Sequence, residues 1–134
     1  MNTEEINKAL VAIIEKKSEL NSLSYEDEKY DDLEDELHDL EDDFVSDYGD
    51  ALEDILMDVH DEICPDTDVL SPLSYIGQKY IKNGEDSYEV DYQQGVYVEV
   101  DDYIDKPTKL VFLPNPFRIF LNIDRQNREL VWPL

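Results

Sequence analysis

Cysteine, glycine and basic residues are all scarce in this sequence, and each shortage argues against a particular kind of bond, site or partner. The 134 residues include one cysteine, Cys64, so no disulfide can form within the chain, and a lone thiol favours a reducing compartment. The four glycines are not spaced to cradle a phosphate group. Eleven basic residues face 35 acidic ones, and the net charge of −24 disfavours direct contact with nucleic acid or an anionic membrane.

Long hydrophobic runs are missing as well. No stretch approaches the roughly 20 consecutive apolar residues that a membrane span needs. The opening residues MNTEE lack the basic start of a secretory signal. Hydrophobic residues still make up 41% of the chain, which is enough for one core of moderate size. We therefore expect a soluble, cytoplasmic protein with a single domain over residues 1–134.

The acidic residues are concentrated in one central segment. Residues 26–68 hold 21 acidic residues and one basic residue, a net charge of −20. Apolar residues within the segment follow the spacing of one helical face up to Phe44, and the stripe then resumes until Pro65 ends it. The segment is therefore predicted to be helical. Gly49 marks either a break or a tolerated weak point in one long helix.

An amphipathic helix is also predicted at the start of the chain. It begins at Asn2 or Thr3, and two glutamates in its first turn suit the helix dipole. The chain then turns, and Ser24 is predicted to cap the second helix. Residues 1–64 should therefore form an antiparallel helical hairpin. The predicted buried face of the first helix consists of Ile6, Leu10, Ile13, Ile14 and Leu20.

The remainder of the chain has the pattern of β-strands. After a connecting loop over 65–71, a short helix is predicted from Ser71 through Tyr80. Alternating residues around Gln93-Gln94-Gly95 predict a hairpin. The expected fold is α+β, with the helical hairpin and its long acidic second helix packed on an antiparallel sheet of four to five strands within residues 72–134. The predicted strands are 88–92, 96–100, 109–113, 117–123 and 129–132.

No motif predicts catalysis, a cofactor or a metal site. His38 and His60 lie beside the apolar stripe, which places both on a solvated helix flank. His60 and Cys64 are one helical turn apart, but two ligands do not make a structural zinc site. No Gly-x-Ser-x-Gly elbow or comparable nucleophile motif is present. The many carboxylates are uninformative, because an acid–base pair needs burial and contrasting environments.

Aromatic residues are the other conspicuous group, with nine tyrosines, four phenylalanines and one tryptophan. Most are expected to form the sheet core and cross-strand pairs. If only one face of the sheet is covered, Tyr97 and Tyr103 could contribute to an exposed aromatic patch of the kind that marks protein contacts.

The acidic helix is the main functional candidate. At ~1.5 Å per helical residue, its charge density is about one per 3 Å, within a factor of two of duplex DNA. Such a surface can compete for a basic groove, so we predict a non-enzymatic binding protein that engages a basic protein surface. The role could be that of an inhibitor, an immunity-type antagonist, a nucleic-acid mimic or an acidic adaptor. The candidate face consists of Asp31, Asp35, Asp39, Asp42, Asp43, Asp50 and Asp54.

Three alternatives stay open. The acidic surface could be only a solubility feature of a structural protein. A pocket between helices and sheet could serve a small-ligand binder or an enzyme, and a buried ionisable pair in a concave site would favour this reading. In a homo-oligomer, Arg118, Arg125 and Arg128 of one copy would meet the acidic helix of another.

Overall fold

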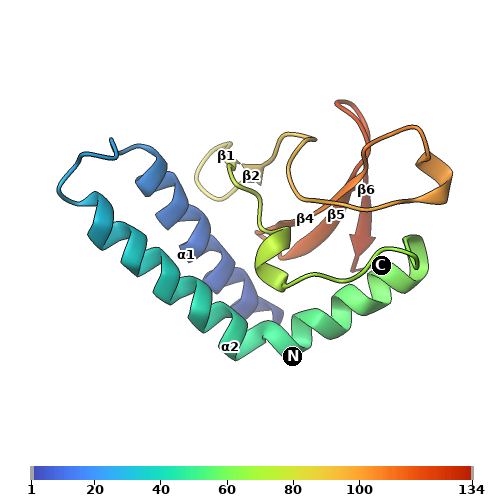
Figure 1. Cartoon of the computed structure of the whole chain (residues 1–134), viewed down its shortest axis with the longest axis horizontal. Coiled ribbons are helices and arrows are strands. Elements are labelled where there is room, and N and C mark those ends of the chain that lie inside the picture. The colour runs from blue at the N-terminus through green and yellow to red at the C-terminus, as the bar shows by residue number, and fades with distance from the viewer. Residues whose placement is uncertain (1, 134) are drawn as a thin grey trace.

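The computed structural model describes residues 2–133 and has two helices followed by antiparallel strands (Figure 1). Helix α1 spans Thr3–Asn21 and helix α2 spans Tyr30–Ile63. The later elements are the 3₁₀ helices η1 (Pro72–Tyr75) and η2 (Asp101–Tyr103) and the strands β1 (Ile81–Lys82), β2 (Tyr88–Glu89), β3 (Val96–Tyr97), β4 (Lys109–Leu113), β5 (Arg118–Asn122) and β6 (Arg128–Trp132). The predicted α+β layout is confirmed.

Helix α1 begins and packs as the sequence predicts. The Asn2 side chain caps it by accepting hydrogen bonds from the backbone N–H groups of Glu4 and Glu5, at 3.0 and 3.3 Å. All five predicted face residues are buried, and α1 packs along the first half of α2. Its N-terminal end is also fixed to the β4–β5 turn, where the side chain of Asn7 exchanges two hydrogen bonds with Asn115.

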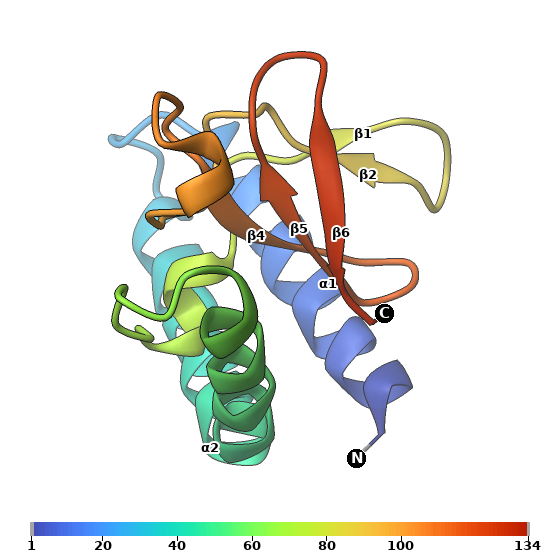
Figure 2. The ribbon, with the colours of Figure 1, turned by 90° about the vertical axis from the view of Figure 1, so that its right-hand side faces the viewer.

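Helix α2 is continuous through Gly49 and bends midway along its length (Figure 1). A glycine weakens a helix locally, so a bend in this region has an evident cause. The first half lies beside α1, and the second half turns toward η1 and the sheet. Figure 2 shows both helices on one side of the strands β4–β6.

The prediction that Ser24 caps α2 is wrong, because the helix begins at Tyr30. The Ser24 hydroxyl instead accepts a hydrogen bond from the backbone N–H of Glu26, and the Asp27 carboxylate accepts one from that of Lys29. Both polar side chains thus stabilise local turns in the connecting loop.

The main sheet is a meander in the order β3-β4-β5-β6, and β1 pairs only with β2. The predicted hairpin around Gln93-Gln94-Gly95 is therefore wrong: β2 pairs with β1, and β3 pairs with β4. Gly95 explains the difference. It has a φ of +113° and lies so close to β4 that a Cβ atom would come within 2.3 Å of the Leu110 carbonyl oxygen. The chain passes against β4 here and does not fold back on itself.

The predicted helix from Ser71 to Tyr80 is only the four-residue η1. The chain becomes extended at Ile76, and the Tyr80 hydroxyl accepts a hydrogen bond from the Gly77 N–H. That hydroxyl donates in turn to the carbonyl of Phe112 in β4, at 2.7 Å. Through these two hydrogen bonds Tyr80 holds the segment against β4. The segment is extended after η1 and does not continue as a helix.

Both faces of the sheet are covered. Phe112 faces the helical layer and stacks on Tyr75 of η1, with ring centroids 5.6 Å apart. On the opposite face Val111 and Leu113 are both fully buried, and Gly95 of the segment 76–95 lies against Val111. Two contacts fasten it there: Asn122 donates to the Gln94 carbonyl, and Arg128 pairs with Glu89.

Candidate interaction surface

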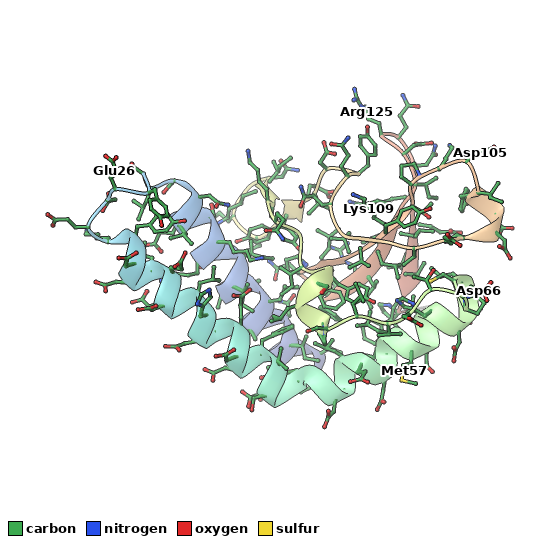
Figure 3. The ribbon with its side chains drawn as sticks, in the orientation of Figure 1. Glu26, Met57, Asp66, Asp105, Lys109 and Arg125 are labelled. Atoms are coloured by element: carbon green, nitrogen blue, oxygen red, sulfur yellow. The ribbon has the colours of Figure 1, made fainter. Side chains whose placement is uncertain are left out.

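All seven aspartates of the predicted face are exposed. At about 100° per residue, they fall within an arc of about 140° that lies opposite the buried stripe of α2. Figure 3 shows the carboxylates projecting along the outer side of the helix. The bend divides the set, since five of the aspartates precede it and Asp50 and Asp54 follow the glycine. We call these seven residues the acidic face.

The acidic face carries its charge without internal neutralisation. Among residues 2–133 there are four ion pairs, and the only member from α2 is Glu36, which pairs with Lys16 at 2.8 Å. None of the seven aspartates takes part. Their combined field is therefore directed at solvent and at whatever approaches the helix.

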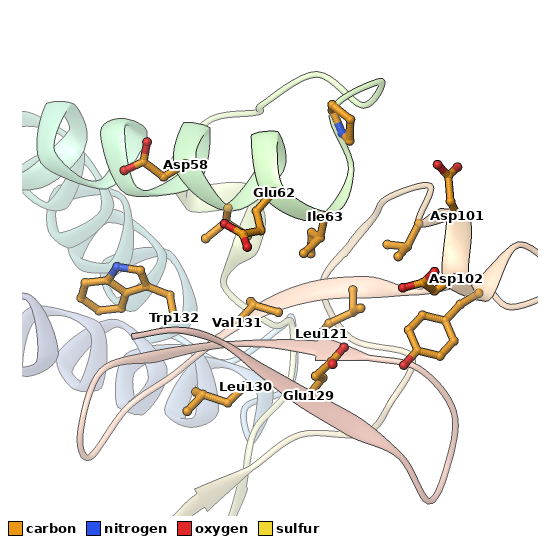
Figure 4. A pocket seen from close by; sticks show the side chains of 14 residues that line it. Asp58, Glu62, Ile63, Asp101, Asp102, Leu121, Glu129, Leu130, Val131 and Trp132 are labelled. Carbon is orange, nitrogen blue, oxygen red and sulfur yellow. The ribbon is translucent and has the colours of Figure 1, made fainter. Parts of the chain in front are cut away.

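A groove lies between the second half of α2, η2 and β6 (Figure 4). It has a volume of about 690 Å³. The buried side chains of Val59, Leu121 and Val131 form its apolar lining together with Val100. Ile63 and the aromatic rings of Tyr103 and Trp132 are also part of the lining, whereas the side chain of Leu130, 42% exposed, points away from α2 (Figure 4). Tyr103 thus contributes to a concave surface, whereas Tyr97, 52% exposed, does not line it.

The charged residues of the groove are all acidic. They come from three elements and are Asp58 and Glu62 of α2, Asp101 and Asp102 of η2, and Glu129 of β6. No lysine, arginine or histidine is among the lining residues. All five carboxylates are exposed, so the groove is concave but holds no buried ionisable pair of the kind expected for an acid–base site.

His60 is buried, and the prediction that it lies on a solvated flank is wrong. Its Nδ1 lies 2.8 Å from the carbonyl oxygen of Thr67, which can only accept, so Nδ1 carries the proton. Its Nε2 then accepts from the Tyr75 hydroxyl at 2.9 Å, and that hydroxyl accepts from the Leu70 N–H. Burial raises the pKa of Tyr75, which keeps the phenol protonated as a donor.

This chain of hydrogen bonds gives His60 a structural position. It fixes the loop after α2 to the helix and to η1, and it occupies both ring nitrogens. Tyr75 of η1 and the loop after α2, which the periodicity of the helix does not reveal, lie against the ring. His38 is exposed, as predicted.

Cys64 is buried at the end of α2, and burial raises the pKa of its thiol to about 11. The thiol is therefore protonated at neutral pH and is a weak nucleophile. Within residues 2–133, no group of three or more histidine, cysteine, aspartate or glutamate side chains is arranged to hold a metal ion.

All three arginines proposed for self-association have partners within the chain. Arg128 pairs with Glu89 at 2.6 Å, and its guanidinium lies 4.4 Å from the ring centroid of Phe120. Arg118 donates to the carbonyls of Pro114 and Pro116. The guanidinium of Arg125 lies over the Tyr92 ring, 5.8 Å from the ring centroid. Meeting a second copy would require these contacts to rearrange or to be shared.

Comparisons with models of protein families, with curated proteins and with solved structures found no match. Neither helix in the described part of the chain combines the length and the apolar composition of a membrane span.

Sequence reasoning located the acidic face and left open a pocket between helices and sheet, but it did not identify the residues of the groove. The groove residues come from three separate stretches, 58–65, 100–103 and 129–132, together with Leu121. No local spacing links these stretches, because the bend in α2 and the order of the sheet bring them together. Tyr103 was the only groove residue that its sequence context singled out as a contact candidate.

Proposed function

We propose that the protein is a non-enzymatic binding protein whose acidic face engages a basic surface on another protein. The observation that carries the proposal is the lack of any ion pair for the seven exposed aspartates within residues 2–133. Like charges three and four residues apart on a helix repel one another. A basic partner relieves this repulsion, and long-range attraction speeds the encounter.

Affinity capture with two charge-matched variants tests the proposal. The face variant carries Asp35→Asn, Asp39→Asn, Asp42→Asn and Asp43→Asn. The control variant removes four exposed carboxylates that lie outside α2 and make no side-chain hydrogen bond or ion pair in the described residues, through Glu85→Gln, Asp86→Asn, Glu99→Gln and Asp105→Asn. Both lose the same net charge, so only the position of the charge differs.

Wild type and both variants are immobilised, exposed to lysate of the source organism at low salt, and eluted with a salt gradient. We expect one basic protein to bind wild type and the control in fixed stoichiometry and to be lost from the face variant. A broad mixture of basic proteins that binds all three equally would show that the charge acts only as a solubility feature. That result would reject the proposal.

A further inference from the structure

The groove beside β6 differs from the acidic face in shape and in chemistry. The acidic face is a convex helix surface made of aspartates, whereas the groove combines a concave apolar lining with carboxylates from three elements (Figure 4). Its acidic residues have no ion-pair partner among residues 2–133. The nearest arginine in sequence, Arg128, is already paired with Glu89.

We propose that this groove binds a peptide segment that combines lysine or arginine side chains with a large apolar side chain. Charge complementarity fixes the sign of the occupant, because five carboxylates without a basic neighbour in the lining would repel an anionic ligand and leave a neutral one without charged partners. The proposal deepens the proposed function, on which it rests for the basic character of the partner.

The apolar lining explains why a peptide with an apolar side chain fits the groove better than a simple cation does. The apolar lining includes Ile63, Tyr103 and Trp132, which are all partly exposed. The buried side chains of Val59, Val100 and Leu121 also belong to the lining. Apolar side chains in this position stabilise a complex only when an apolar group covers them. A polyamine has charge but no bulky side chain, whereas a basic peptide offers both.

The aromatic rings add a second mode of recognition for the same cations. Tyr103 and Trp132 line the groove, and both ring types attract the ammonium and guanidinium groups of lysine and arginine. Trp132 packs on Phe117 at a centroid distance of 5.6 Å, which fixes one side of the indole. It is also the only tryptophan of the chain, so its fluorescence reports on this groove and on no other surface.

The experiment uses a displayed library of random nine-residue peptides selected on the wild-type protein. A groove variant carries Ile63→Ser, Asp102→Asn and Glu129→Gln, all at positions that line the groove and are at least partly exposed. The matched control carries Met57→Ser, Asp42→Asn and Asp43→Asn, which also removes one apolar side chain and two charges, but from the outer side of α2. Thermal unfolding followed by circular dichroism verifies that both variants are folded.

We expect the selected peptides to be rich in lysine or arginine together with a large apolar residue, and to change the Trp132 emission on binding. Their affinity should fall at least tenfold in the groove variant and less than twofold in the control. Failure to select such peptides, an unchanged Trp132 emission, or equal binding by both variants overturns the proposal. Displacement of the peptides by micromolar spermine would point instead to a small polycation as the occupant.

The experiments can reject either proposal while the other one stands. If the captured partner depends on the four aspartates of the face variant while the groove variant changes nothing, the proposed function stands and the groove inference fails. If selected peptides report through Trp132 while the face variant still captures the same proteins as wild type, the groove inference stands and the role of the acidic face fails.

Discussion

The helical part of this protein (α1 and α2) and its sheet part (the strands and their connections) differ in how far their charged side chains are paired. Residues 26–68 carry a net charge of −20, and only Glu36 of α2 has an ion-pair partner among the described residues. In the sheet part, Arg128 pairs with Glu89 and Lys106 pairs with Asp124. Lys106 and hydrogen bonds from Asn127 and Gln126 hold the pKa of Asp124 far below its usual range.

This difference indicates which interactions stabilise each part. The helical part has few specific polar contacts, so burial of its apolar stripe must outweigh the repulsion on its outer side. The sheet part depends on close backbone approaches and side-chain hydrogen bonds that join distant segments. Substitutions in the two parts should therefore act through different physical causes.

The largest effect is expected in the buried stripe of α2. Leu52 is fully buried, and Leu52→Ala should lower the free energy of unfolding by about 4 kcal/mol through lost burial and the cavity left behind. Met57→Ala, on the exposed side of the same helix, should change it by less than about 0.5 kcal/mol. Urea unfolding followed by circular dichroism measures both. Equal effects would show that the stripe is not what stabilises the helical part.

The corresponding test in the sheet part concerns the close approach of the backbone at Gly95 to β4. Gly95→Ala should destabilise by about 3 kcal/mol, because the added Cβ would meet the Leu110 carbonyl at 2.3 Å and the φ of +113° is strained for alanine. Gly84 is the matched control, since its φ is +85° but no atom lies within 4 Å of the added Cβ. Gly84→Ala should cost about 1 kcal/mol. Similar losses at both sites would mean that the close approach to β4 contributes little.

The same contrast explains how far the sequence could predict the structure. In the helical part, periodicity identified both helices and the exposed aspartates, because a helix face depends only on neighbours three and four residues apart. The prediction that Ser24 caps the second helix was wrong, because a polar side chain can equally stabilise a local turn. The prediction for His60 was wrong because its burial depends on η1 and on the loop after α2, both of which lie outside the helix whose periodicity was used.

In the sheet part, strand positions were easier to predict than strand partners. The segments 109–113 and 117–123 were located closely, because alternation is local. The pairing of β3 with β4 was missed, since Gly95 reads equally well as a hairpin turn and as a close-approach site. A pocket between helices and sheet was left open as an alternative, but the residues of the groove could not be predicted, because they meet only after the helix bends and the sheet forms.

The smallest expected effect concerns the charge of the helical part and has the opposite sign. The four substitutions of the face variant remove repulsive pairs at spacings of three and four residues, so they should stabilise the protein by about 1 kcal/mol at low salt. Aspartate and asparagine have similar helix propensities, which isolates the charge. The gain should shrink in 1 M salt, where the screening length is about 3 Å. The control variant, altered at Glu85, Asp86, Glu99 and Asp105, should gain much less. A gain that is equal in both variants, or that does not depend on salt, would mean that it does not come from repulsion along α2, and the proposal that a basic partner relieves this repulsion would lose its support.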